Sequence, residues 1–270
     1  MTATETILLD LDHDVRVATI TLNRPEQRNP VSDPEMIEAL VATLSRLDAE
    51  LSTRVIVLTG AGKAFSTGGN LKAMGEAGGL NDKLPAQTRR NYRQGIQRIP
   101  LLFEALEVPV VAAVNGPAIG AGCDLACMCD LRIAGESARF AESFVKVGIV
   151  PGDGGAWLLP RVVGFAKACE LALTGDTIDA AEALACGLVS QVVPDAELLT
   201  RAKALARRIA ANPPHVVRMT RRLLREASKV NLDTLLEMSA AMQALAHATE
   251  DHKEAIAAFL DKRTPRFTGA

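Results

Sequence analysis

The chain has 270 residues, 48% of them hydrophobic, which suits one large domain, or a domain with an appendage, around a sizeable core. Only 3% are aromatic, so aliphatic side chains must fill that core. The formal net charge of −2 argues against general affinity for nucleic acid or membranes. Every apolar run is too short or too interrupted by charge to span a membrane, and the first residues lack a signal-peptide pattern, so we expect a cytoplasmic protein.

The first third of the chain predicts alternating strands and a helix. Residues 6–11 and 15–22 are typical of a β-hairpin. A helix follows and begins at Ser32, because a proline two residues later and a glutamate three residues later complete a capping box. The apolar run at 55–58 predicts a buried strand. A strand, a helix and a strand of these lengths indicate a right-handed parallel crossover.

The rest of the chain is predicted to be mixed α/β at first and then wholly helical. The predicted elements are a helix from about 87, a strand at 110–114, a helix at 121–128, a strand at 131–134, an extended piece at 138–140, a helix at 163–173, a helix capped by Asp179 and closed by Gly187, and helices at 196–210, 215–228, 232–248 and 250–261. We therefore expect an α/β core in residues 1–195 and a helical C-terminal part in residues 196–270.

Charge and cysteine are both clustered in the sequence. Residues 201–230 contain nine Lys or Arg residues and one acid, which gives them a charge of +8 and leaves −10 for the rest. We interpret this segment as solvated helix faces or a subunit interface, with docking of a polyanion as the alternative. Cys123, Cys127 and Cys129 lie close together without a nearby histidine or a zinc-site spacing, which indicates buried thiols and no metal site.

Two of the predicted strands lead into glycine-rich loops. The strand at 55–58 is followed by Gly60–Lys72, and the strand at 110–114 by Asn115–Asp124. Backbone N–H groups at two such junctions can point at one oxygen, which is the plan of an oxyanion hole. Neither loop fits a nucleotide-binding motif, since the third glycine of the dinucleotide fingerprint is replaced by Phe65.

Five sequence blocks, in this order and spacing, resemble the crotonase family of enoyl-CoA hydratases and isomerases. They are Leu22–Asn29, Gly62–Leu71, Asn115–Asp124, Gly148–Gly155 and Leu173–Leu188, and the tail Phe259–Arg263 is similar to the C-terminus of the family. The resemblance implies an α/β fold of the crotonase type, a spiral of ββα units with a helical C-terminal part. It also implies an acyl-CoA thioester substrate, no cofactor beyond the CoA of that substrate, and a homotrimer or dimer of trimers built by residues 196–270.

The resemblance also assigns the site residues by position. The N–H groups of Gly69 and Ala121 would form the oxyanion hole, and Ala121 would begin a helix, where the dipole favours a developing enolate. Phe259 and Lys262 would reach the adenine of the CoA bound to a neighbouring subunit. Arg28 would contact the CoA phosphates or, as an equal alternative, would be an ordinary charged residue on the surface. The substrate-binding residues that follow are Arg28, Ser66, Gly68, Asn70, Leu71, Gly120, Phe144, Phe259 and Lys262.

The acid/base residues depart from the family pattern. Of the two glutamates that hold water in family hydratases, the first falls on Asp124 and the second on Phe144, which cannot carry a proton. Asp124 and Asp153 are therefore the catalytic candidates, with Glu142 as a weaker third. The structural alternatives are a turn-forming role for Asp153 beside glycines and a helix-dipole role for Asp124.

These features predict an acyl-CoA enzyme that stabilises a thioester enolate and is atypical for simple hydration. Double-bond or ring isomerisation is the alternative, because residues 144–151 and 157–161 are similar to the ring-opening phenylacetyl-CoA epoxide isomerase group, although the acid of that group matches Gly152. A non-catalytic or RNA-binding family member is a further alternative, motivated by the basic segment.

Overall fold

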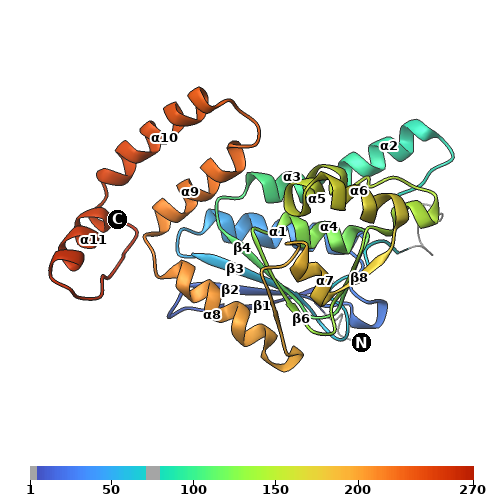
Figure 1. Ribbon diagram of the computed structural model, residues 1–270, viewed down its shortest axis with the longest axis horizontal. Coiled ribbons are helices and arrows are strands. Elements are labelled where there is room, and N and C mark those ends of the chain that lie inside the picture. The colour runs from blue at the N-terminus through green and yellow to red at the C-terminus, as the bar shows by residue number, and fades with distance from the viewer. Residues whose placement is uncertain (1–4, 71–79) are drawn as a thin grey trace.

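The computed structural model describes residues 5–70 and 80–270 and has a mostly parallel, six-stranded sheet at its centre (Figure 1). The strands in spatial order are β1 (Ile7–Asp12), β2 (Val17–Leu22), β3 (Val55–Gly60), β4 (Val110–Val114), β6 (Leu131–Gly135) and β9 (Gln191–Val193). Within the described part of this sheet, β1 and β2 alone pair antiparallel, which confirms the hairpin. β2 and β3 pair in parallel, with Val17 opposite Val55, which confirms the crossover connection.

A second, three-stranded sheet lies beside the first and carries one side of the candidate site. It consists of β5 (Pro117–Ile119), β7 (Arg139–Ala141) and β8 (Thr177–Asp179), in the order β5-β7-β8. β5 and β7 are parallel, with Ile119 opposite Ala141. The sequence predicts only β7 of these three, because a three-residue strand is too short to show an alternating pattern.

Helices connect and cover the two sheets. They are α1 (Pro34–Ala49), α2 (Pro85–Gln94), α3 (Arg98–Ala105), α4 (Ala121–Met128), α5 (Gly155–Val163), α6 (Phe165–Thr174), α7 (Ala180–Ala185), α8 (Leu198–Ala210), α9 (Pro214–Glu226), α10 (Leu232–His247) and α11 (Glu250–Leu260), with short 3-10 helices at Pro25–Gln27, Ser143–Val147 and Asp195–Glu197. Asp179 caps α7 as predicted, since its side chain accepts the N–H of Glu182 over 2.9 Å. The predicted cap at Ser32 is wrong: α1 begins after Asp33, and the Ser32 hydroxyl accepts the N–H of Asn70 instead.

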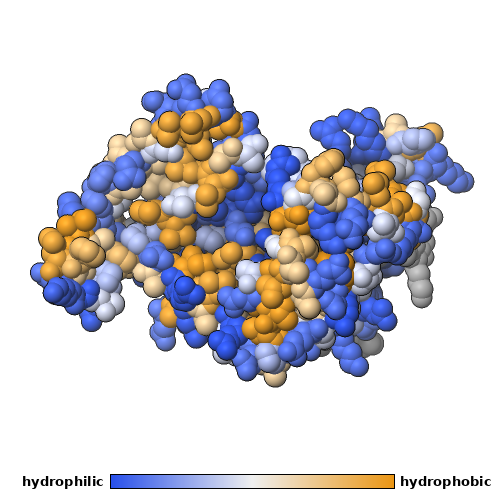
Figure 2. All heavy atoms as spheres, viewed as in Figure 1, coloured by the Kyte–Doolittle hydropathy of each residue, from blue (hydrophilic) through white to orange (hydrophobic). Residues whose placement is uncertain are grey.

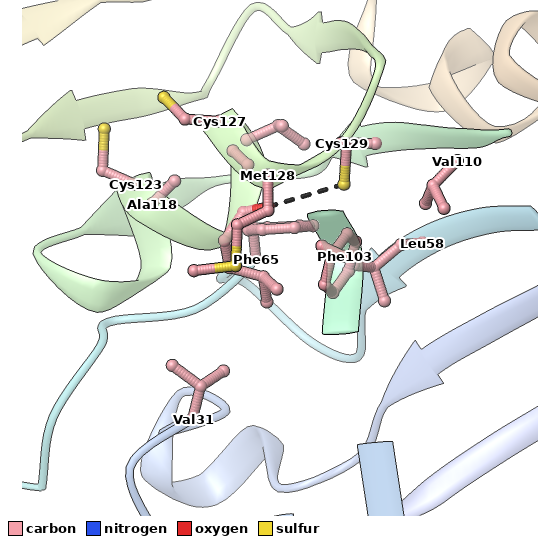
Figure 3. Close-up of a cluster of buried hydrophobic side chains, with 14 of the residues drawn as sticks. Val31, Leu58, Phe65, Phe103, Val110, Ala118, Cys123, Cys127, Met128 and Cys129 are labelled. Carbon is pink, nitrogen blue, oxygen red and sulfur yellow. Dashed lines mark hydrogen bonds between the residues drawn. The ribbon is translucent and has the colours of Figure 1, made fainter. Parts of the chain in front are cut away.

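The main core lies between the six-stranded sheet and helices α1, α3 and α4. Phe65 and Phe103 fill it together with aliphatic residues, and Figure 3 shows the thiol of Cys129, at the end of α4, pointing toward them, whereas the thiols of Cys123 and Cys127 point away. Cys123, Cys127 and Cys129 are buried and unpaired, which confirms the prediction of buried thiols. Within residues 5–70 and 80–270, no three His, Cys, Asp or Glu side chains are placed to hold a metal ion.

The other face of the sheet is covered by α8, whose alanines allow close packing. Ala202 and Ala206 are fully buried against Val57 and Val111. The predicted boundary at residue 195 therefore precedes a helix that belongs to the core. Helices α9, α10 and α11 then extend away from the sheets as an arm (Figure 1). In the part of the chain that the structure describes, no helix is long and apolar enough to cross a membrane.

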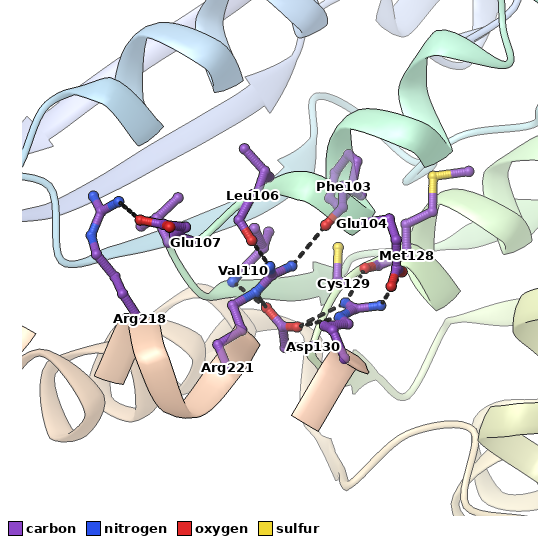
Figure 4. A network of polar contacts seen from close by, with 12 residues as sticks. Phe103, Glu104, Leu106, Glu107, Val110, Met128, Cys129, Asp130, Arg218 and Arg221 are labelled. Carbon is purple, nitrogen blue, oxygen red and sulfur yellow. Dashed lines mark hydrogen bonds and ion pairs between the residues drawn. The ribbon is translucent and has the colours of Figure 1, made fainter. Parts of the chain in front are cut away.

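The basic segment attaches this arm to the core. Arg221 is 5% exposed, bonds to Asp130 over 2.8 Å and donates to the carbonyls of Phe103 and Leu106 (Figure 4). Arg225 also pairs with Asp130, over 2.7 Å, and donates to the Met128 carbonyl at the end of α4. These arginines satisfy carbonyls at two helix C-termini of the same chain, so this part of the segment is a buried attachment and not the solvated helix face that the sequence predicted. Arginines paired in this way are not free to dock a polyanion.

Candidate active site

Two backbone N–H groups lie together where β3 and β5 lead into their loops. A Cβ placed on Gly68 would lie 2.9 Å from the Ala121 nitrogen and closer still to the Ile119 carbonyl oxygen, so the two loops touch. Position 68 therefore has no room for a side chain, and its φ of +79° is a left-handed conformation that also favours glycine. Among the described residues, the N–H groups of Gly69 and Ala121 have no hydrogen-bond acceptor, and Ala121 is the first residue of α4. Both donors are therefore available to an external oxygen.

A buried hydroxyl fixes the first loop. Ser66 is fully buried, and its Oγ donates to the Asn29 carbonyl over 2.7 Å and accepts the N–H of Gly68 over 3.1 Å. Its backbone bridges to β5 in parallel through Ala118. Ser66 therefore shapes the loop instead of lining the cavity. The Gly68 carbonyl in turn accepts the N–H of Val31, which fixes the next residue, Gly69.

The two donors open into a cavity of about 130 Å³ with mainly apolar walls and one acid. Its lining includes Gly69, Gly120, Ala121, Phe144 and Asp153, so five of the predicted site residues meet there. The Phe144 ring packs beside Gly120, where a Cβ would lie 3.6 Å from its Cζ.

Residues that the sequence analysis did not select complete the cavity wall. Tyr92 and Ile96, at and just after the end of α2, line it together with Ile149 and Val147. Tyr92 packs on Gly152, whose carbonyl accepts the Gln97 amide over 2.7 Å, so the turn before Asp153 is held from this side. A helical pattern alone gives no sign of which residues of α2 face a cavity.

Three carboxyl groups are buried together next to this cavity. Asp124, Glu142 and Asp153 are 0%, 1% and 3% exposed. The position of Gly155 shows their proximity, because a Cβ there would collide with both Asp124 Oδ1 and Glu142 Oε1. Asp124 lies between the other two acids, and its Oδ2 accepts the N–H of Gly155 over 3.1 Å. Of the three, only Asp153 lines the cavity.

Burial raises the pKa of each acid, and the charges of neighbouring acids raise it further for Asp124 and Glu142. Burial raises the pKa of Asp124 well above its usual 3.8, and the charges of Glu142 and Asp153 raise it further. Burial raises the pKa of Glu142 to about 8, although the hydrogen bond from Asp124 opposes this. The pKa of Asp153 is also raised by burial and is lowered in part by the same neighbour. The group therefore holds protons at neutral pH, which suits proton transfer.

Glu142 and Phe144 face different ways, which the sequence did not predict. An extended segment would place residues two apart on one face. The chain instead enters a 3-10 helix at Ser143–Val147, so Phe144 lines the cavity and Glu142 turns to Asp124 behind it. Glu142, the weakest of the three catalytic candidates in the sequence, therefore lies beside Asp124 in the acid cluster.

Four further predicted substrate-binding residues, which the structure describes, do not line the cavity. Arg28 is exposed in a left-handed conformation, and its carbonyl accepts the N–H of Thr67 beside the first loop. Asn70 follows Gly69 and is tied to Ser32, while Leu71 lies outside the described residues. Phe259 lies in the last turn of α11 and Lys262 just after it, at the opposite end of the molecule from α2 (Figure 1). Within one chain they do not reach the cavity.

Comparison with known proteins places this geometry in a family. The family model described as enoyl-CoA hydratase/isomerase matches residues 12–270. A probable enoyl-CoA hydratase of Mycobacterium tuberculosis is 39% identical over 98% of both chains. The 1,2-epoxyphenylacetyl-CoA isomerase of Escherichia coli is 39% identical over 94% of this chain and 95% of its own length. The crystal structure of an enoyl-CoA hydratase from Bacillus anthracis superposes with a TM-score of 0.90 and 37% identity, covering 98% of this chain and 100% of the other. The chain is therefore an enzyme of the enoyl-CoA hydratase/isomerase family, with the crotonase fold.

Proposed function

We propose that this enzyme moves a proton between carbon atoms of an acyl-CoA thioester and thereby shifts a double bond, instead of adding water to it. The observation that carries the proposal is the composition of the cavity: two free backbone donors, one carboxyl group and a phenyl ring. A hydratase of the two-glutamate type needs a second carboxyl group to hold its water, and the corresponding residue is Phe144.

The two donors would stabilise the enolate. The thioester oxygen would accept the N–H groups of Gly69 and Ala121, and the N-terminus of α4 favours the negative charge that develops there. The loss of one such donor typically costs about 3 kcal/mol of transition-state stabilisation. The loop positions supplied by Gly68 and Ser66 keep both donors in place before substrate arrives.

Asp153 would carry the proton. It would take a proton from one carbon of the acyl chain while the C–H electron pair moves into the enolate, and return a proton to another carbon as the enolate collapses. Burial raises its pKa above the usual range of an aspartate, which is the direction that proton transfer at neutral pH favours. Phe144 and Ile149 would keep water away from the enolate.

A ring-bearing acyl-CoA is the second candidate substrate. The observation in its favour is the 39% identity to the Escherichia coli 1,2-epoxyphenylacetyl-CoA isomerase. The assays should therefore compare linear and ring-bearing acyl-CoA thioesters side by side.

The test compares isomerisation with hydration. We expect turnover of a linear 3-enoyl-CoA or of the epoxide of phenylacetyl-CoA, and slow hydration of crotonyl-CoA. Asp153→Asn should lower isomerisation by about 10²- to 10⁴-fold. The matched control is Asp233→Asn, at an exposed position in the first turn of α10, which should leave the rate unchanged. Efficient crotonyl-CoA hydration that survives both Asp124→Asn and Asp153→Asn would overturn the proposal.

We also propose that the arm joins copies of this chain into a trimer or a dimer of trimers. Large apolar residues on it are exposed in the single chain (Figure 2): Leu224, Leu232, Leu236, Leu245 and Phe259. Such surface is costly to leave in water. Light scattering should give a mass of three or six chains of 28.7 kDa, and a monomer would contradict this.

A further inference from the structure

We propose that Glu142 is a proton-storing residue of the site, which exchanges a proton with Asp153 through Asp124, so that the three carboxyl groups act as one closed reservoir. The inference rests on the proposed function, in which Asp153 moves the proton of the substrate. Glu142 does not line the cavity, so it would act through Asp124 and not on the substrate itself.

The hydrogen bonding of the cluster requires shared protons. No amide, hydroxyl or cationic donor in the described part of the chain reaches Asp124 Oδ1, Asp153 Oδ1 or either carboxylate oxygen of Glu142. The partners within reach are the carboxyl groups themselves, with Asp124 between the other two. A carboxylate only accepts hydrogen bonds, so these contacts form only if some of the groups carry a proton. Without these shared protons the buried carboxyl oxygens would have no hydrogen-bond partner, which would strongly destabilise the folded protein.

Asp124 is oriented for the central position. Its Oδ2 accepts the N–H of Gly155 over 3.1 Å, which leaves Oδ1 to carry a proton toward a neighbouring acid. Oδ1 and Glu142 Oε1 crowd the same side of Gly155. Only a residue without a side chain leaves room for both oxygens, so the first residue of α5 permits the contact.

The groups around the cluster do not neutralise it. Cys123 and Cys127 of α4 face it on the side of Glu142, and Tyr92 of α2 faces Asp153. No Lys or Arg within residues 5–70 and 80–270 forms an ion pair with any of the three acids. In this proposal the three acids share one negative charge and two protons at rest, because two buried charges this close repel each other.

The proton balance then follows. When Asp153 takes a proton from the substrate, the C–H electron pair enters the enolate and the cluster becomes neutral, with three protons. Asp153 can then exchange its new proton for that of Asp124, and Asp124 can exchange its proton for that of Glu142, by paired transfers that leave one proton on each group. Asp153 returns one of the three protons to the second carbon, and the cluster recovers its charge. The proton that returns is often not the one that was removed.

Isotope retention tests this in a single turnover in ordinary water, with substrate deuterated at the carbon that loses its hydrogen. Complete exchange among three protons leaves the label in about one third of the product, and Glu142→Gln, which removes one exchanging site, should raise this to about one half. The control Glu136→Gln, at an exposed position, should match the wild type. Equal retention in Glu142→Gln and wild type, full retention in wild type, or complete loss to solvent would each overturn the inference.

A second measurement needs neither substrate nor turnover. Infrared spectra of the substrate-free protein at pH 7 should contain neutral carboxylic acid bands, one of which disappears in Glu142→Gln but not in Glu136→Gln. If no label leaves the substrate carbon in any variant, the proposed function fails, and the infrared result still decides whether Glu142 holds a proton. A spectrum that does not change with Glu142→Gln would overturn the storage role alone.

Discussion

Gly155 donates its backbone N–H to Asp124 Oδ2 over 3.1 Å and thereby joins the first turn of α5 to the buried acid cluster. The same glycine leaves the space in which Asp124 and Glu142 meet. One residue thus supplies a hydrogen bond to one acid and room for a second, so the geometry of the cluster depends on a position that has no side chain.

Replacement of Gly155 by alanine should reduce both stability and turnover. The new methyl group would collide with Asp124 Oδ1 and Glu142 Oε1 and force the carboxyl groups apart, at a cost of about 1–3 kcal/mol in the free energy of unfolding. Urea denaturation followed by Trp157 fluorescence measures the stability, and kcat is measured on the same preparation. Gly187→Ala is the control, because its φ of +78° brings backbone strain while its nearest contact is 3.9 Å away. It should lose stability and keep its kcat; an equal loss of kcat in both variants would contradict the prediction.

Gly68→Ala should lower kcat more than it raises KM. Its Cβ would press on the Ala121 nitrogen and the Ile119 carbonyl and so move Gly69 away from Ala121. If the two N–H groups bind the oxyanion, misplacing one should lower kcat by about 10²- to 10³-fold. Steady-state kinetics on the best acyl-CoA substrate measure this. A variant that folds with an unchanged kcat would mean that the two donors do not act on the reacting oxygen.

The stability of the protein should fall as pH rises from about 5 to 8. Burial raises the pKa of Glu142 from 4.5 to about 8, so between these values the folded protein binds more protons than the unfolded chain. Unfolding free energy then decreases with pH, by at most about 1.4 kcal/mol per pH unit for one proton. Glu142→Gln should flatten this slope, measured by urea denaturation at several pH values, whereas Glu136→Gln should not. A slope that is unchanged in Glu142→Gln would show that Glu142 does not titrate in this window.

Arg221→Ala should destabilise the attachment of the arm by about 3–5 kcal/mol, because it removes one partner of a buried ion pair and two donors to carbonyl groups. Asp130 keeps its contact with Arg225, so the loss should fall at the lower end of that range. Arg208→Ala is the control, since Arg208 is exposed and forms no ion pair in the described part of the chain. It should change the unfolding free energy by less than about 0.5 kcal/mol. Similar losses in the two variants would mean that burial of Arg221 does not stabilise the arm.

The sequence predicted the elements whose patterns are long. β1, β2 and β3 are six-residue strands rich in apolar residues, and α1 carries an apolar stripe of several turns. The short strands β5, β8 and β9 were missed because three residues show no period. Their pairing is set by the neighbours they meet in space. This matters for the site, since β5 and β7 end side by side and deliver Ala121 and Glu142 to the same place.

The glycine loops and the acids at 124 and 153 were readable from the sequence because their residue types and spacing resemble a family pattern. The sequence alone therefore determined the fold, the family and five of the residues that line the cavity, but not Tyr92 or Ile96. Tertiary structure decided which of them face it: the 3-10 turn directs Phe144 inward and Glu142 behind, and the core acids draw Arg221 and Arg225 inward from a segment that reads as surface. The physical reason is that the direction of a side chain, and the pKa of a buried acid, depend on neighbours that are distant in sequence and meet only in the folded protein.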